Sequence, residues 1–349
     1  METRYFPGDA LTAFGTTALT AAGLEHDAAD LTSRSLVWSD LRGTHSHGLL
    51  RLPLYVTALR SGGINPRPVL RWTRESGATA VLDADGALGQ VAMNAAVERV
   101  SRLARENGVG VVSVQNSTHY GAGIHWTHQL ADAGFAALVT STTGPTVTPH
   151  GGTETVLGTN PFTATAPSAD ETHLTADMAT SAGAYGKVVA ARNENRQIPT
   201  GWAVDAEGQP TTDPEAALGG ALLPFGAAKG SALSVLIEAL SASLTTAAFA
   251  HQTQDIWVEE SSRMNTGHLV IALDTGAFTG RTHTESRVRH LQERVRSSSR
   301  TGTRVYAPGD IEHETARRAG EDVTLAASTV ELLDALAEDL GLSPLSTCV

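Results

Sequence analysis

Cysteine and positive charge are scarce in this chain of 349 residues. Cys348 is the single cysteine, which excludes an intramolecular disulfide and a cysteine-based metal cluster and is typical of a reducing compartment. The 25 Lys and Arg residues face 37 Asp and Glu residues, giving a net charge of -12. The sequence therefore has no broad basic surface for nucleic acid.

Signals for membrane insertion or export are also lacking. No stretch reaches the ~18 uninterrupted apolar residues of a membrane-spanning helix. The opening METRYFPGDALTAFG lacks the basic segment and apolar run of a secretory signal. We therefore expect a cytoplasmic protein with neither a membrane nor a nucleic acid as partner.

The glycine turn that binds dinucleotides in Rossmann folds is missing too. Gly108-Val109-Gly110 precedes its strand and lacks the third glycine of the G-x-G-x-x-G pattern. A Rossmann pyrophosphate site is therefore not expected. The chain length favours two domains of ~100–200 residues each, or three that share the termini.

What the sequence does contain is a clear series of helices and strands. Residues 12–41 have helical apolar spacing with a break at 23–26, after which Asp27 is expected to cap a second helix. Further helices are predicted over residues 90–106, 126–133, 226–250 and 281–300, and strands over 79–83, 109–114, 136–140, 162–166 and 268–274.

The stretch Ser39–Tyr55, SDLRGTHSHGLLRLPLY, concentrates polar and ionisable side chains. Ser46 is predicted to cap a helix that begins at His47, kinks at Pro53 and ends at Gly62-Gly63. In such a helix His47, Arg51 and Tyr55 would share one stripe.

These residue types suit a small carboxylate substrate. A guanidinium can hold a carboxylate in a fork, and an imidazole can exchange a proton near neutral pH. On this stretch alone a solvated helix face is the better interpretation, by about two to one, because such clusters are often structural.

A second polar segment follows the apolar strand predicted over residues 109–114. Asn116–Gly123 reads NSTHYGAG, and a polar, glycine-rich loop at the end of a buried strand is a common place for site residues. His119 would be rigidly placed there, with Gly121 and Gly123 leaving space beside it.

The order of motifs resembles the malate/L-lactate dehydrogenase family that is unrelated to the Rossmann-fold enzymes of the same names. This family includes ureidoglycolate, sulfolactate, diketogulonate and piperideine- or pyrroline-2-carboxylate oxidoreductases. The matching stretches cover nearly the whole chain: DLRGTHSHGLLRLPLY (40–55), NSTHYG (116–121), GTNP (158–161), DMATSAGAYGK (177–187), IPTGWAVDAEGQPTTDP (198–214), LLPFGAAKG (222–230) and NTGHLVIALD (265–274).

The resemblance implies an α/β fold with a mostly antiparallel nucleotide-binding sheet and a helical domain built from both termini. It implies one unit of residues 1–75 with 285–349, for dimerisation and substrate, and an NAD(P)-binding and substrate region of residues 76–284. The implied activity transfers hydride between NAD or NADP and a small 2-oxo or 2-hydroxy acid, or alternatively reduces a cyclic 2-imino acid. A homodimer is also implied.

Site residues follow from the same resemblance, position by position. His119 matches the acid/base that protonates the carbonyl oxygen as hydride arrives, a task that needs a pKa near the working pH. The substrate-side cluster comprises Ser46, His47, Arg51 and Tyr55, with Arg51 on the carboxylate. The cofactor-side positions are Thr143, Asp177, Met178, Ala179, Lys229, Pro308, Gly309 and Asp310. Lys229 beside Gly230 suits a phosphate.

Without the resemblance, Asp177 would be read as a strand-end cap and Lys229 as a surface residue. The chain also departs from the family pattern. Met264 stands where a ureidoglycolate dehydrogenase would have a basic residue, with Arg263 one position earlier. Ala228 replaces the usual Tyr or Pro, and Ala242 and Thr246 replace glycines. These changes leave the substrate open.

Two other classes of function remain as alternatives. A metal-dependent hydrolase or lyase could use His119, His125 and His128, with His45 and His47 as further ligands. No carboxylate has the spacing of a known zinc motif, so this class receives a weight of about one in ten. A non-catalytic relative that binds a ligand is the other alternative.

Overall fold

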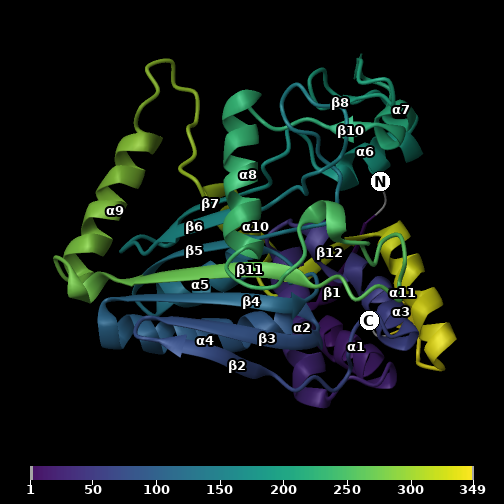
Figure 1. Ribbon diagram of the computed structural model, residues 1–349, viewed down its shortest axis with the longest axis horizontal. Helices are drawn as coiled ribbons and strands as arrows, with labels where there is room; N and C mark the ends of the chain where they lie inside the picture. Colours follow the sequence, from purple (N-terminus) through teal and green to yellow (C-terminus); the bar gives the residue numbers. More distant parts are fainter. Residues whose placement is uncertain (1–2, 348–349) are drawn as a thin grey trace.

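The computed structural model of the chain describes residues 3–347, so Cys348 lies outside the described residues. No helix within that range is both long and apolar enough to cross a membrane. The described chain forms a central sheet with helices on both faces, a helical region and a small outlying unit (Figure 1).

The central sheet has seven strands in the order β2-β3-β4-β11-β5-β6-β7. Neighbouring strands are antiparallel except for β3 and β4, which are parallel. The expected α/β fold with a mostly antiparallel sheet, distinct from a Rossmann fold, is confirmed. The strands are β2 (Arg71–Ser76), β3 (Thr79–Ala87), β4 (Val109–Ser117), β11 (Thr266–Asp274), β5 (Phe135–Ser141), β6 (Phe162–Ala166) and β7 (Leu174–Met178).

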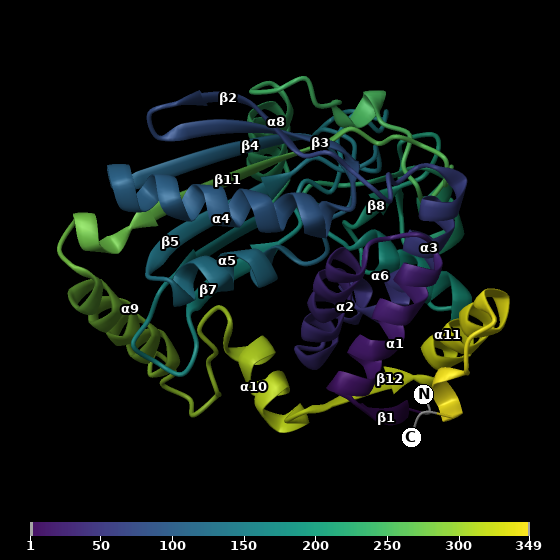
Figure 2. The ribbon, with the colours of Figure 1, turned by 90° about the horizontal axis from the view of Figure 1, so that it is seen from below.

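Helices cover both faces of this sheet (Figures 1 and 2). α4 (Gly89–Asn107) and α5 (Gly123–Asp132) lie on one face, and α8 (Ala228–Ala242) lies on the other. The buried residues of α4 recur at helical spacing, as an amphipathic helix requires. Its buried members include Ala92, Met93, Ala96, Val100 and Leu103. Together with β3, β4, β5 and β11 they form the core beneath the sheet.

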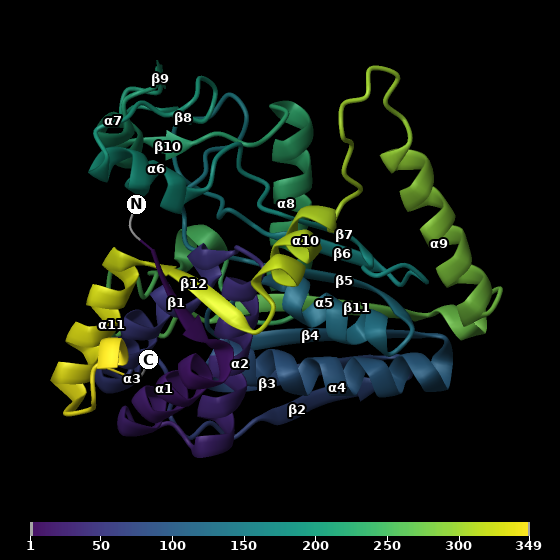
Figure 3. The ribbon, with the colours of Figure 1, turned by 180° about the vertical axis from the view of Figure 1, so that it is seen from behind.

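A separate core joins the two ends of the chain. β1 (Thr3–Pro7) pairs antiparallel with β12 (Asp322–Ala326). α1 (Gly8–Ala21), α2 (His26–Leu41) and α3 (Leu52–Ser61) pack with α11 (Ala327–Leu340) in one hydrophobic cluster. Figure 3 shows the first and last helices side by side. The expectation of a helical region built from both termini agrees with this packing.

The remaining elements surround these two cores. A three-stranded sheet of β10 (Ala221–Leu222), β8 (Ala203–Val204) and β9 (Pro210–Thr211) carries α6 (Tyr185–Asn193) and α7 (Pro214–Gly219). α9 (Arg281–Arg296) leads through a long loop to α10 (Asp310–Ala319). Short 3-10 turns lie at His45–His47, Leu49–Arg51, Ala250–Gln252, Thr275–Ala277 and Leu345–Thr347.

Two predicted helix starts are wrong. Ser46 caps no helix, because residues 45–51 form two 3-10 turns and α3 begins only at Leu52. Pro53 lies in the first turn of α3, where its missing N–H has no intrahelical partner to lose, so no kink forms. α2 starts after Glu25 without a side-chain cap, so the expected cap at Asp27 is also wrong.

Candidate active site

Two segments that are far apart in the chain meet at His119. Oη of Tyr55, on α3, lies 2.6 Å from Nδ1 of His119, which follows β4. The His47 ring stacks on the His119 ring at a centroid separation of 5.5 Å and an interplanar angle of 25°. The structure therefore brings together the predicted acid/base residue and two members of the predicted substrate-side cluster.

Tyr55 is itself held by a buried amide. Nε2 of Gln90, in the first turn of α4, donates to Oη of Tyr55 at 3.2 Å. Burial raises the pKa of Tyr55 to about 12, so its hydroxyl stays protonated near neutral pH. Oη of Tyr55 can accept the Nδ1–H of His119, which keeps that proton on Nδ1 in both protonation states and leaves Nε2 to exchange a proton with a substrate. Sequence reasoning gave Gln90 no role.

A buried carboxylate shapes the turns that present His47 and Arg51. Asp40 accepts a hydrogen bond from the N–H of Leu49 at 2.7 Å and contacts Nδ1 of His45 at 2.8 Å. A Cβ on residue 48 would lie 2.1 Å from Oδ1 of Asp40, so only glycine fits at Gly48. Asp40 thus fixes the path of residues 45–49. His45 is engaged by Asp40 and takes no part in the His119 cluster.

Arg51 faces the same cluster with its guanidinium. Nε of Arg51 donates to the carbonyl oxygen of Ser46 at 2.6 Å, and Cζ lies 4.9 Å from the ring centroid of Trp257. The two terminal nitrogens have no hydrogen-bond partner among the described residues. They can therefore donate in parallel to a carboxylate. Ser46 contributes its hydroxyl to Nδ1 of His47 at 2.9 Å.

The loop over residues 253–262 closes one side of the site, and sequence reasoning missed it. The indole of Trp257 contacts the His119 ring edge-on at 5.2 Å between centroids and also stacks on Arg51. Asp255 precedes it by two residues, and its charge interacts with that of Arg51. Ile256 between them is fully buried in the helical core and anchors the loop. No local motif marks this loop in the sequence.

The two stacked imidazoles are neutral near neutral pH. Each ring is half-buried. Burial and the charge of Arg51 lower the pKa of His47 to about 4. Burial, His47 and Arg51 hold the pKa of His119 well below its usual range.

The loops that carry several of the predicted cofactor-side residues are linked by a chain of hydrogen bonds. Oγ1 of Thr143 accepts the N–H of Thr159 at 2.9 Å. The carbonyl of Thr159 accepts the N–H of Thr180 at 2.8 Å, and the carbonyl of Thr180 accepts the N–H of Phe225 at 3.0 Å. The loops after β5 and β7 are thereby connected to the loop that opens α8, where Lys229 lies.

Asp177 and Met178 end β7 with exposed side chains, and Ala179 follows them half-buried. Oδ1 of Asp177 accepts from Thr163 at 2.7 Å, and Oδ2 accepts the N–H of Ile124 at 3.3 Å. A Cβ on residue 123 would lie 2.0 Å from Oγ1 of Thr163. Gly123 therefore allows close packing of α5 on β6, and the expectation that it leaves open space is wrong.

The start of α8 is strained and carries an exposed cation. Ala227 has a φ of 54°, a left-handed conformation unusual for a residue with a side chain. Lys229 is exposed in the first turn and has no described ion pair. A Cβ on residue 230 would lie 1.8 Å from the carbonyl oxygen of Phe225, so Gly230 lets the loop fold tightly onto the helix.

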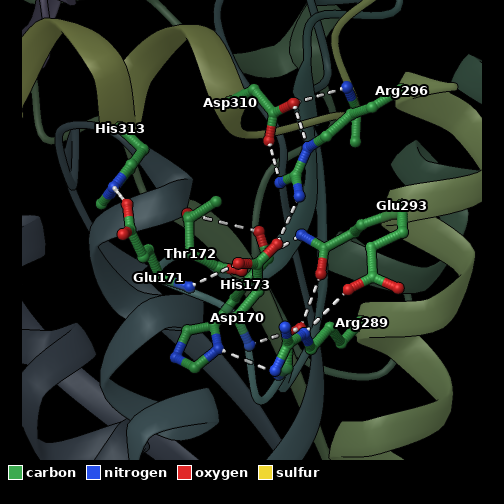
Figure 4. A network of polar contacts seen from close by, with 12 residues as sticks. Asp170, Glu171, Thr172, His173, Arg289, Glu293, Arg296, Asp310 and His313 are labelled. Carbon is green, nitrogen blue, oxygen red and sulfur yellow. Dashed lines mark hydrogen bonds and ion pairs between the residues drawn. The ribbon is translucent and has the colours of Figure 1, made fainter.

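The segment Pro308–Asp310 lies beside β7. The carbonyl of Pro308 accepts the N–H of Thr175 at 3.1 Å, and Gly309 has a φ of 97°. The carboxylate of Asp310 is bound by Arg296, which also contacts Asp170 (Figure 4). Asp310 is thus committed to an ion-pair network that joins α9 to α10.

The histidines proposed as alternative metal ligands do not converge. His125 contacts Gln129 and the Trp38 ring, and His128 bonds to Thr175. His119 faces Tyr55 instead. Within residues 3–347, no group of three or more His, Cys, Asp or Glu side chains is arranged to hold a metal ion.

The residues that depart from the family pattern lie in different parts of the structure. Met264 is buried in the helical core, and Ala242 is buried in α8. The N–H of Thr246 donates to Oε1 of Gln115 at 2.9 Å, and Ala228 is exposed at the start of α8. Arg263 lines a cavity of about 270 Å³ near Asp85 and Asn116.

Comparison with known proteins places these features in a family. A family profile described as malate/L-lactate dehydrogenase matches residues 6–334. The chain is 36% identical over 321 residues to the ureidoglycolate dehydrogenase (NAD(+)) of Escherichia coli, covering 90% of this chain and 89% of that protein. It is 38% identical over 286 residues to a Delta(1)-pyrroline-2-carboxylate/Delta(1)-piperideine-2-carboxylate reductase of Pseudomonas putida, covering 81% and 82% of the two chains.

The solved structures give the same result. The sulfolactate dehydrogenase from Methanocaldococcus jannaschii superposes with a TM-score of 0.91 at 32% identity, and the match covers 99% of each chain. Sequence and fold agree over nearly the full length. The chain therefore belongs to the malate/L-lactate dehydrogenase family.

Proposed function

We propose that this protein transfers hydride between NAD or NADP and carbon 2 of a small 2-oxo or 2-hydroxy acid. The observation that carries the proposal is the nearness of His119 and Arg51, which both contact the indole of Trp257. Nδ1 of His119 is hydrogen-bonded to Tyr55, and Nε2 has no hydrogen-bond partner among the described residues. Arg51 presents two guanidinium nitrogens that likewise lack a described partner. A proton-transfer group beside a carboxylate fork is what a 2-oxo acid requires.

Each side chain has a defined task in this reaction. Arg51 binds the substrate carboxylate and so fixes carbon 2 near the His119 ring. His119 gives a proton from Nε2 to the carbonyl oxygen in reduction and takes it from the hydroxyl in oxidation. Tyr55 and Gln90 keep the ring oriented. The bound nicotinamide supplies or accepts the hydride.

The residues present fit such a cofactor. Thr143, Asp177, Met178 and Ala179 border one hydrogen-bonded set of loops, and Lys229 lies where that set meets α8. An unpaired ammonium at a helix start, beside a loop held in a left-handed conformation, suits a pyrophosphate or phosphate. We propose that these residues, with Pro308, Gly309 and Asp310, hold NAD or NADP.

Reduction of a cyclic 2-imino acid is the second candidate. The similarity to the Pseudomonas putida reductase favours it, and the same two groups would serve. Arg51 would hold the ring carboxylate while His119 manages the proton at nitrogen. The candidates differ in the bond reduced, C=O against C=N.

A substrate panel tests the proposal. Purified protein is assayed with NADH and NADPH against 2-oxo acids and cyclic 2-imino acids, with a His119→Ala variant as control. Turnover that depends on His119 is expected for at least one class. Nicotinamide fluorescence that reports binding without any turnover would instead identify a non-catalytic relative, and activity that depends on added metal would favour the hydrolase class.

We also propose that the protein is a cytoplasmic homodimer. α8 presents apolar side chains to solvent at Val235, Leu236 and Leu240, and Leu244 follows in the next loop. An exposed apolar face of this kind is typical of a subunit interface. α8 belongs to the proposed region of residues 76–284, so this face would extend the interface beyond the dimerisation unit proposed at residues 1–75 with 285–349. Light scattering at micromolar concentration is expected to give a dimer, and a monomer would contradict the proposal.

A further inference from the structure

We propose that this site selects substrates with a single negative charge, because Asp255 holds a carboxylate next to Trp257, whose ring stacks on the arginine that binds the substrate. The inference rests on the proposed function and narrows its substrate class. The expected substrates are monocarboxylic 2-oxo or 2-hydroxy acids whose side chain is uncharged. Acids with a second carboxylate or a sulfonate are expected to be poor substrates.

Asp255 borders both halves of the site. Its Oδ1 accepts the N–H of Trp257 at 3.2 Å, and its carboxylate also accepts the N–H of Gly144. A Cβ on residue 144 would lie 2.6 Å from Oδ2 of Asp255, so glycine permits the approach. Gly144 follows Thr143 on the proposed cofactor side, and Trp257 stacks on Arg51 on the substrate side.

The hydrogen bonds around Asp255 favour its charged form. Burial raises the pKa of Asp255 overall, and the N–H groups of Trp257, Gly144 and Ile256 and the charge of Arg51 offset only part of that rise. Three backbone donors aimed at one carboxylate stabilise the anion. An anion at this place can also accept a hydrogen bond from an uncharged N–H or O–H group on the substrate.

The site offers one permanent cation against these negative charges. In the part of the chain that the structure describes, Arg51 is the only Lys or Arg whose charge acts on His47 or His119. Both imidazoles have lowered pKa values and are neutral near neutral pH. Arg263 lines a different cavity, beside Asp85.

Charge balance then separates the two substrate classes. The charges of Arg51 and Asp255 cancel, so a bound monoanion leaves one uncompensated negative charge and a dianion leaves two. Uncompensated charge in a partly buried site is costly, and two like charges near each other add a repulsion that water screens poorly. An uncharged polar group in place of the second anion avoids this cost and can donate to Asp255.

An isosteric substrate pair tests the inference by activity. 2-Oxosuccinamate and oxaloacetate differ in shape very little, but the second has an additional negative charge. In the wild-type protein kcat/KM for 2-oxosuccinamate should exceed that for oxaloacetate by about tenfold or more. Asp255→Asn should reduce this ratio by about tenfold, mainly by improving oxaloacetate.

The matched control is Glu259→Gln, which removes one negative charge from the same loop at an exposed position. It should leave the ratio unchanged. A wild-type ratio near one or in favour of oxaloacetate would overturn the inference, as would an Asp255→Asn variant that folds and keeps the wild-type ratio. Failure of every 2-oxo acid to react would instead count against the proposed function.

A binding measurement on the wild-type protein needs neither turnover nor a variant. Oxamate and oxalate are an amide and carboxylate pair that cannot accept hydride productively. Calorimetric titration of the protein with saturating NADH, or NADPH, should show oxamate binding about tenfold or more tightly than oxalate. Equal or tighter binding of oxalate would overturn the inference even if Asp255→Asn were unstable.

Discussion

Oη of Tyr55 lies 2.6 Å from Nδ1 of His119, although 64 residues separate the two in the chain. The contact joins the helical region to the end of β4 and decides which ring nitrogen of His119 faces the substrate. Gln90 donates to the same oxygen and so holds the phenol in place for the Nδ1–H of His119. The orientation of the His119 ring thus depends on two buried neighbours, Tyr55 and Gln90.

Removing the Tyr55 hydroxyl should leave Nδ1 of His119 without its partner. Tyr55→Phe keeps the ring volume but loses a buried hydrogen bond. The loss costs about 1–3 kcal/mol, part of which is lost orientation of the His119 ring. We expect kcat to fall by about ten- to a hundredfold with little change in KM, since Arg51 is untouched. Steady-state kinetics with a thermal unfolding control check this. A loss confined to KM would contradict the positioning role.

Loss of the Arg51 guanidinium should weaken substrate binding while cofactor binding persists. Arg51→Ala removes a charge-assisted pair worth about 1.5–3 kcal/mol, or roughly ten- to a hundredfold in KM or somewhat more. Arg51→Lys should restore little, because an ammonium cannot form the bidentate pair. KM for the acid and Kd for the nicotinamide cofactor are the measurements. An unchanged KM in Arg51→Ala would count against the assignment.

The lowered pKa of His119 sets opposite pH dependences in the two directions. Oxidation needs the neutral ring, which is present whenever pH exceeds the lowered pKa, so kcat/KM for oxidation should be flat between about pH 6 and 8 and fall only in acid. Reduction needs the imidazolium, whose population falls about tenfold per pH unit above that pKa. Reductive kcat/KM should therefore fall steadily as pH rises. An oxidative rate that climbs through pH 7 would contradict a lowered pKa.

Lys229 should contribute to cofactor affinity through charge. Lys229→Gln removes an exposed ammonium at the start of α8, so a loss of about three- to tenfold in cofactor affinity is expected, together with a weaker dependence on salt. Lys187→Gln is the matched control, since Lys187 is also exposed but lies on α6. Nicotinamide fluorescence titrations give both Kd values. Equal effects in the two variants would contradict the assignment of Lys229 to the cofactor site.

Local patterns predicted part of this architecture well. The break between α1 and α2, the left-handed end of α3 at Gly62 and the strand that leads to His119 all follow from apolar spacing and glycine placement. His47, Arg51 and Tyr55 do share one site, but two 3-10 turns bring them there in place of the predicted continuous helix.

The rest depends on contacts between distant segments. The pairing of β1 with β12 joins the two ends of the chain. The sequence of neither strand indicates which strand it pairs with. Asp255 and Trp257 reach Arg51 through a loop anchored by Ile256, and nothing near them in the sequence indicates that contact. Gln90 is a polar residue at a helix start, and its role emerges only once Tyr55 is placed beside it.

Pre-steady-state hydride transfer in His119→Ala and His47→Ala is the most direct test of the account. The two rings are stacked neighbours, so either could be the proton-transfer group on position alone. The account predicts that His119→Ala loses about 10²–10⁴ in the transfer rate and the pH dependence while still binding cofactor, and that His47→Ala keeps both. If His47→Ala abolishes transfer and His119→Ala retains it, the central assignment is wrong.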